Sequence, residues 1–199
     1  MTEYWTALKE QNADVLDRLL RNSPELVHSA INSNPWKLEI DDSYPYETRG
    51  VHFCSFSGRE QLLQILLKHG PDLEMATFEE NKGLTTPLVL AAWEGSVESC
   101  RLLLDAGANP NTWASAESSL YTAAEHHAWD KVALLVKYGA QHDIFTACIC
   151  GELETVESQI KAYRPLLERK SIKRNRTPLE EATEHQQDQV VEFLEELMK

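Results

Sequence analysis

The most informative stretch for predicting the fold of this chain is Thr86-Pro87-Leu88-Val89-Leu90-Ala91-Ala92-Trp93-Glu94-Gly95. A threonine caps a helix well, and a proline is tolerated in the first turn because its missing N–H would have no partner there. Ala91 and Ala92 are small enough for a second helix to approach closely. We therefore predict a helix that begins after Thr86 and ends before Gly95.

A 12-residue spacing recurs on both sides of this stretch. It separates Gly58 from Gly70, Gly95 from Gly107, and His127 from Gly139. Each interval holds an apolar stripe with helical periodicity, and each closes at a glycine, which suits the left-handed residue that ends many helices. Each unit is therefore predicted to contain a helix, a tight turn, a second helix and a loop.

The Thr-Pro-Leu start appears a second time, at Thr177-Pro178-Leu179-Glu180-Glu181-Ala182. Both starts share the Thr-Pro-Leu and the alanine of the T-P-L-H-x-A pattern of the ankyrin repeat, with Val89 in place of the histidine in the first. The chain resembles the ankyrin-repeat family over nearly its whole length. The resemblance implies an all-α ankyrin-repeat solenoid of stacked helix-turn-helix units with β-turn or hairpin fingers. Tetratricopeptide-type repeats fit less well, because they lack the proline start and the Gly-Ala-Asn exit found at residues 107–109.

We expect a single domain over residues 1–199 with about six units, of which the two terminal ones act as caps. The approximate units are 1–30, 48–77, 83–112, 114–142, 143–172 and 173–199, with an insertion at 31–47. Only 24 residues separate Ala123 from Ala147, the corresponding small residues of units four and five. Because the family period is near 33, the loop between these units should lack most of its finger. Units of a solenoid share a stacked core with their neighbours, so no residue pair far apart in sequence needs to touch.

The composition is that of a soluble protein with an acidic surplus. Apolar residues make up 42% of the chain, and the formal net charge is −13. This charge argues against general nucleic-acid binding and against an anionic membrane surface, and it favours a partner protein of basic character. The chain shows no apolar run of about 18 residues and no signal-like start. We therefore expect a cytoplasmic protein with reduced cysteines.

The sequence predicts no catalytic residue, no metal site and no cofactor. Cys148 and Cys150 are two apart on a predicted helix and point to different sides, and Cys54 and Cys100 occupy core positions of their units. His127 stands where other units have a turn glycine, so it is expected to be a turn residue. We find neither a phosphate-binding glycine loop nor the G-x-S-x-G motif of a serine nucleophile.

In ankyrin-repeat proteins the concave face is built from the fingers and the exposed side of each first helix. The resemblance implies that the exposed pairs include Phe56 and Ser57, Trp93 and Glu94, Glu125 and His126, and Ile149 and Cys150. The predicted partner-binding residues combine some of these with aromatic residues of the loops: Trp36, Tyr44, Tyr46, Phe56, Trp93, Glu94, Trp113, Glu125 and His126. Exposed aromatic residues beside charges are typical of interface hot spots.

The aromatic residues of the insertion leave two alternatives open. They could bind the partner, or they could fold onto Phe56 and Trp93 and fill the groove with the protein's own loop. Within the insertion, residues 37–40 alternate in polarity and could form an extended strand or a hairpin arm. Trp5 and Trp129 fall on helix-packing positions, and we expect them in core or capping roles.

The C-terminal part of the chain has a marked charge asymmetry. Seven basic residues and one acid lie between Lys161 and Arg176, whereas residues 177–199 hold seven acids and one base. The basic run either pairs with the acidic last unit or contacts an anion or a partner. Since it covers one loop, it does not predict nucleic-acid binding.

These features favour a non-catalytic protein-interaction module that binds a partner protein through a concave aromatic and acidic face. A regulator or inhibitor is one form of this hypothesis. The alternative is a small-ligand-binding or weakly enzymatic protein that uses an aromatic pocket near Trp93. A third hypothesis is a structural role through self-association, although we expect a monomer.

Overall fold

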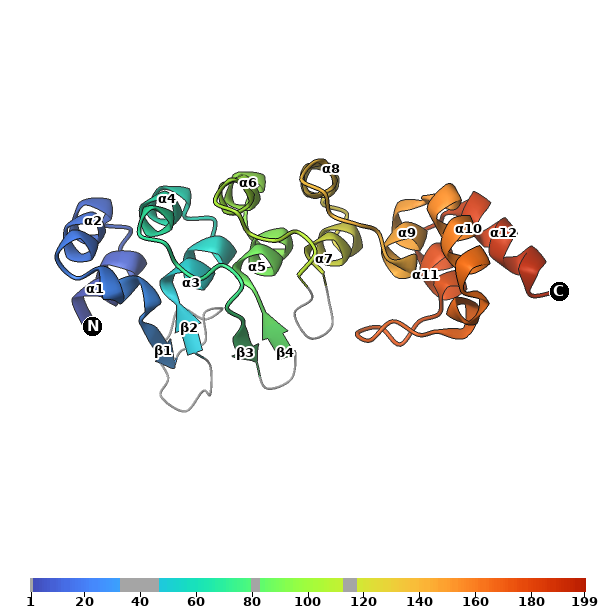
Figure 1. The fold of residues 1–199 in the computed structure, drawn as a ribbon, viewed down its shortest axis with the longest axis horizontal. Helices are drawn as coiled ribbons and strands as arrows, with labels where there is room; N and C mark the ends of the chain where they lie inside the picture. Colours follow the sequence, from blue (N-terminus) through green and yellow to red (C-terminus); the bar gives the residue numbers. More distant parts are fainter. Residues whose placement is uncertain (1, 33–46, 80–82, 113–117) are drawn as a thin grey trace.

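The computed structural model describes residues 2–32, 47–79, 83–112 and 118–199. These residues form twelve α-helices in six helix-turn-helix pairs, which we number units one to six. The units stack into an elongated array with the two termini at opposite ends (Figure 1). The stacked array confirms the predicted all-α solenoid.

The first helices of the units are α1 (Thr2–Lys9), α3 (Gly50–Phe56), α5 (Pro87–Trp93), α7 (Ser119–Glu125), α9 (Ile144–Cys150) and α11 (Pro178–Glu184). The second helices are α2 (Ala13–Asn22), α4 (Glu60–Lys68), α6 (Val97–Asp105), α8 (Trp129–Lys137), α10 (Leu153–Ala162) and α12 (Asp188–Leu197). In units one to four the first helices form an inner row and the second helices an outer row (Figure 1). Two 3-10 helices, η1 (Pro24–His28) and η2 (Arg164–Glu168), follow α2 and α10.

The helix starts follow the capping rules that the sequence suggested. The Thr86 hydroxyl accepts a hydrogen bond from the backbone N–H of Val89, and Pro87 is the first residue of α5. At α11, Thr177 and Glu180 form a reciprocal capping box. Both Thr-Pro helix starts are therefore confirmed, because side-chain oxygens satisfy N–H groups that have no partner inside the helix.

The turns explain the 12-residue spacing. The exit glycines all have positive φ, with values of 66° at Gly70, 96° at Gly107 and 91° at Gly139. His127 takes the same left-handed conformation at φ 54°, so it is the turn residue that its position predicts. Gly95 is needed for a different reason, since a Cβ at this position would collide with the backbone oxygen of Ser55 in the preceding unit.

Two fingers are β-hairpins. Strand β1 (Ala30–Asn32) pairs antiparallel with β2 (Glu47–Arg49), and β3 (Thr77–Glu79) pairs antiparallel with β4 (Gly83–Thr85). The connection from α8 to α9, residues 138–143, is fully described and contains no strand, which confirms the missing finger between units four and five. Residues 33–46 lie outside the described residues, and the extended segment expected at 37–40 is among them.

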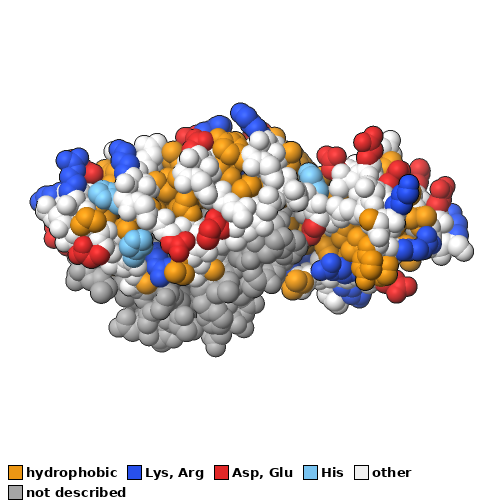
Figure 2. All heavy atoms as spheres, in the orientation of Figure 1, with side chains coloured by type: hydrophobic (Ala, Val, Ile, Leu, Met, Phe, Trp, Pro, Cys, Tyr) orange, Lys and Arg blue, Asp and Glu red, His pale blue; other side chains and the backbone are white. Residues whose placement is uncertain are grey.

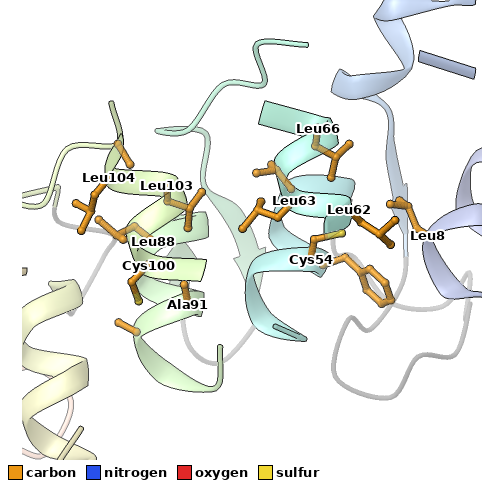
Figure 3. Close-up of a cluster of buried hydrophobic side chains, with 14 of the residues drawn as sticks. Leu8, Cys54, Leu62, Leu63, Leu66, Leu88, Ala91, Cys100, Leu103 and Leu104 are labelled. Atoms are coloured by element: carbon orange, nitrogen blue, oxygen red, sulfur yellow. The ribbon is translucent and has the colours of Figure 1, made fainter. Parts of the chain in front are cut away.

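The core between the two helix rows is rich in leucine, alanine and cysteine side chains. Leu8, Leu63 and Leu103 are fully buried, and Figure 3 shows side chains of α3, α4, α5 and α6 directed into this space. Cys54 and Cys100 belong to the same cluster, where burial raises their thiol pKa to about 12 and about 11. At neutral pH both thiols are therefore protonated packing groups.

A side chain from a following unit caps several inner helices at their C-terminal end. Arg59 donates to the last carbonyls of α1, and the Nε2 of Gln187 donates to Ile149 at 2.9 Å. Lys131, which is buried in α8, donates to three carbonyls at the end of α5 at 3.0, 3.1 and 3.3 Å. Because these carbonyls have no partner within their own helix, the caps tie units two, four and six to the units before them.

The stacking changes between units four and five. The outer helices α2, α4, α6 and α8 lie side by side, but α8 does not pack on α10 in this way. The buried apolar residues accordingly form two clusters, one in units one to four and one in units four to six. Residues of units four and six touch across unit five, since the hydroxyl of Tyr121 lies 3.3 Å from Oε1 of Glu181. The array therefore contains a contact between units that are not neighbours, which stacking of adjacent units does not require.

Candidate functional site

Three of the predicted site residues form a row of rings along the inner helices. Phe56 ends α3, Trp93 ends α5, and His126 follows the end of α7, so stacking the units places the three side by side. The ring centroids of Phe56 and Trp93 are 5.9 Å apart, and those of Trp93 and His126 are 6.3 Å apart. We call Phe56, Trp93 and His126 the aromatic row. Phe56 and Trp93 are half-buried, and His126 is exposed.

The two acidic residues predicted in the site, Glu94 and Glu125, differ in their exposure to solvent. Glu94 follows the end of α5 and is exposed, as expected. Glu125 is the last residue of α7, and only 6% of its side chain is exposed. The expectation that Glu125 lines an open groove is therefore wrong. Its carboxylate is covered by Arg174, whose Nε donates to Oε1, and by Lys173, whose Nζ lies 3.7 Å from Oε2.

The cover comes from a loop that we call the basic loop, residues 169–176, between η2 and α11. It extends back from the C-terminal units toward α7 (Figure 1). The Nζ of Lys173 also lies 6.0 Å from the ring centroid of Trp93, at the outer limit of a cation–π contact. Figure 2 shows basic side chains on the lower side of the C-terminal units and acidic ones along their upper and outer edge. The basic loop thus joins the aromatic row to Glu125.

The base of the basic loop is anchored in a buried polar network. The Ser171 hydroxyl donates to Oε1 of Glu181 at 3.0 Å, and the backbone N–H of Arg176 donates to the Ser171 oxygen at 3.2 Å. Glu181 is 1% exposed, and burial raises the pKa of its carboxyl group. Tyr121 of α7 completes the network. A buried network of this kind fixes the loop base, because an unpaired member would carry a large desolvation cost.

Of the two alternatives for the basic run, pairing with the last unit is confirmed in part. Arg176 lies 3.8 Å from Glu181 and 3.3 Å from Glu184, both of which are in α11. The tip of the loop pairs instead with Glu125 of unit four, a contact that sequence reasoning missed. Two features of the sequence together could have indicated this contact: the basic run after η2 and the missing finger between units four and five. Without that finger, there is space beside α7 into which the basic run can fold back.

Three further expectations about exposure concern residues near the change in stacking between units four and five. Ile149 was expected on the exposed side of α9, but it is fully buried in the apolar cluster of units four to six. Cys150 was expected to be exposed and is half-buried. Trp129 was expected in a core or capping role; it is 47% exposed and so lies outside the core, since α8 does not pack on α10 as it does on α6. Trp5 is buried, as expected.

The exposed side of α8 borders an open groove of about 520 Å³ on the outer surface. Its lining includes Trp129, Val132, Ala133, Val136 and Cys150. This groove lies where outer-helix packing is interrupted, and none of the predicted site residues lines it. The groove is therefore a second exposed apolar surface, and substitutions in it serve as controls for substitutions in the aromatic row.

Four predicted site residues, Trp36, Tyr44, Tyr46 and Trp113, lie outside the described residues. Whether the insertion binds a partner or fills the groove therefore stays a prediction. The described residues contain no group of three histidine, cysteine or acidic side chains that could hold a metal ion. None of the helices in the described ranges is both long and apolar enough to cross a membrane.

The repeated helix pairs, hairpin fingers and turn glycines define a class of repeat protein, and the family comparison agrees. A family model described as ankyrin repeats in three copies matches residues 5–114 and again residues 51–146. These matches cover more than half of the chain, which therefore belongs to the ankyrin-repeat family. A search of curated proteins finds no match. Ankyrin repeats generally mediate protein–protein interactions, and proteins built from them are typically non-enzymatic.

Proposed function

We propose that this protein is a non-catalytic interaction module that binds a partner protein through its concave face, centred on the aromatic row. The observation that carries the proposal is the alignment of Phe56, Trp93 and His126 across three consecutive units. Aromatic side chains contribute large contact area with few rotatable bonds, and they are enriched at binding hot spots. Partial burial holds the rings in place before binding, which lowers the ordering cost of association.

The surrounding charge supports a protein partner with basic character. The chain carries a net charge of −13, and Glu94 is exposed beside Trp93. Complementary charge speeds encounter and selects against partners of like charge. We propose that the protein acts as a regulator or inhibitor by covering a surface of this partner.

Affinity capture from a lysate of the native cells tests the proposal. The wild-type chain is compared with Trp93→Ala and with a matched control, Trp129→Ala, which removes an exposed tryptophan from the outer surface. We expect one protein to be retained by the wild type and the control and lost with Trp93→Ala. Retention by Trp93→Ala together with loss in Trp129→Ala would move the binding site to the outer groove. Circular dichroism confirms that both variants remain folded.

Small-molecule binding near Trp93 is tested separately. A ligand that binds only the folded state raises the melting midpoint. A metabolite that raises the midpoint of the wild type and of Trp129→Ala, but not of Trp93→Ala, would contradict a purely protein-binding role.

A further inference from the structure

The carboxylate of Glu125 is an enclosed anion at an unfavourable position. Its side chain is 6% exposed, and it is the last residue of α7. A helix C-terminus carries partial negative charge, so a carboxylate there is less favourable than at the N-terminus. Enclosure removes most of the water that would otherwise solvate the charge. The site therefore requires a cation.

The present occupants are two consecutive cations from the tip of the basic loop. Arg174 donates to Oε1 of Glu125, and Lys173 lies between Oε2 of the same carboxylate and the ring of Trp93. Their side chains are 45% and 37% exposed, so water and salt reach both ion pairs. A competing cation can therefore approach from the solvent side, although the Glu125 carboxylate itself is enclosed.

Buried hydrogen bonds, rather than ion pairs open to solvent, hold the base of the same loop. Ser171 and the backbone of Arg176 are joined to each other and to buried Glu181. The tip can consequently leave Glu125 without unfolding the loop base or α11. An anchored base with an exchangeable tip keeps the tip cations at high effective concentration near their site.

We propose that Lys173 and Arg174 are an internal occupant of a cation site formed by Glu125 and Trp93, and that the partner protein presents its own lysine or arginine pair to displace them. This inference rests on the proposed function and specifies the partner chemistry. A free partner cation competes with the tip, so removing the tip charges strengthens binding of a basic segment.

The probe is a fluorescently labelled peptide with the sequence of residues 171–176, blocked at both ends. A control peptide carries glutamate in place of the lysine and arginine that correspond to Lys173 and Arg174. The full-length protein is prepared as the wild type and as a vacated variant, Lys173→Ser with Arg174→Ser. A matched variant, Arg169→Ser with Lys170→Ser, removes the same charge from the same loop at its other end. Fluorescence anisotropy at low ionic strength measures binding, because salt would screen exposed charges.

We expect the vacated variant to bind the basic peptide about tenfold more tightly than the wild type or the matched variant, since the tip no longer competes. Adding Glu125→Gln to the vacated variant should reduce binding to the level of the control peptide. Equal binding by the wild type and the vacated variant, or no binding by the vacated variant, would overturn the proposal. So would binding that survives Glu125→Gln. Thermal melts confirm that every variant compared is folded.

The two proposals fail in distinguishable ways. If lysate capture depends on Trp93 but the peptide does not bind the vacated variant, the partner uses the aromatic row without a cation pair. If the peptide binds as expected but no protein is captured through Trp93, the cation site exists and the proposed function is wrong.

Discussion

His52 should make the protein lose stability as the pH falls below neutrality. It lies in the first turn of α3, is completely buried, and donates from Nε2 to the carbonyl oxygen of Met75 at 2.8 Å. Burial lowers the pKa of His52 from 6.5 to about 4, and Arg49 acts in the same direction. The Met75 carbonyl and Asp72 oppose the shift without cancelling it.

The sign and size of the effect follow from linkage. The folded state binds a proton at His52 less readily than the unfolded state, so this stability is complete above pH 6.5 and is lost as the pH falls toward about 4. One pKa unit corresponds to about 1.4 kcal/mol, so the full loss is on the order of 3 kcal/mol. At about pH 4.5 most of this loss, roughly 2–3 kcal/mol, is expected relative to about pH 8.

Urea unfolding followed by circular dichroism at these two pH values measures the effect. Other histidines and carboxylates also titrate, so the wild type is compared with His52→Gln. The glutamine amide can still donate to the Met75 carbonyl but does not titrate. We expect His52→Gln to lose roughly 2–3 kcal/mol less than the wild type between the two pH values. An equal loss in both proteins would refute the assignment of His52 as a buried neutral histidine.

Further predictions concern stability and association. Lys131→Met leaves three carbonyls at the end of α5 without their donor and should lower the unfolding free energy by about 1–3 kcal/mol. The control Lys68→Met, on the exposed surface of α4, should change the unfolding free energy little. Gly95→Ala should cost about 1–3 kcal/mol because its Cβ meets Ser55, and an unchanged urea midpoint would contradict this packing. Trp5→Ala should lower the unfolding free energy by about 3–5 kcal/mol, and Trp129→Ser should lower it by less than about 0.5 kcal/mol. A larger loss for Trp129→Ser than for Trp5→Ala would place Trp129 in the core. Light scattering should give the monomer mass at every concentration tested, and a mass that rises with concentration would favour self-association.

The features predicted correctly from the sequence are those set by local chemistry. Thr86 and Pro87 start a helix through contacts within one turn, and Gly107 ends one through its own backbone conformation. The missing finger after Gly139 follows from chain length alone. Such features need no knowledge of distant residues.

The features predicted wrongly depend on how unit six sits against unit four. Repeat position places Ile149 and Glu125 on the exposed side of their helices, but the apolar cluster of units four to six buries one and the basic loop covers the other. The change in stacking after α8 leaves Trp129 exposed. A periodic pattern assigns each position the average environment of its family. It therefore cannot anticipate contacts made by an irregular unit.

The most direct test of partner binding through the aromatic row is site-specific photocrosslinking. A photoreactive phenylalanine analogue is placed at Phe56 in one protein and at Trp129 in another, and each is irradiated in the native lysate. We predict one crosslinked partner from position 56 and none from position 129. A partner crosslinked from position 129 and not from position 56 would contradict binding through the concave face.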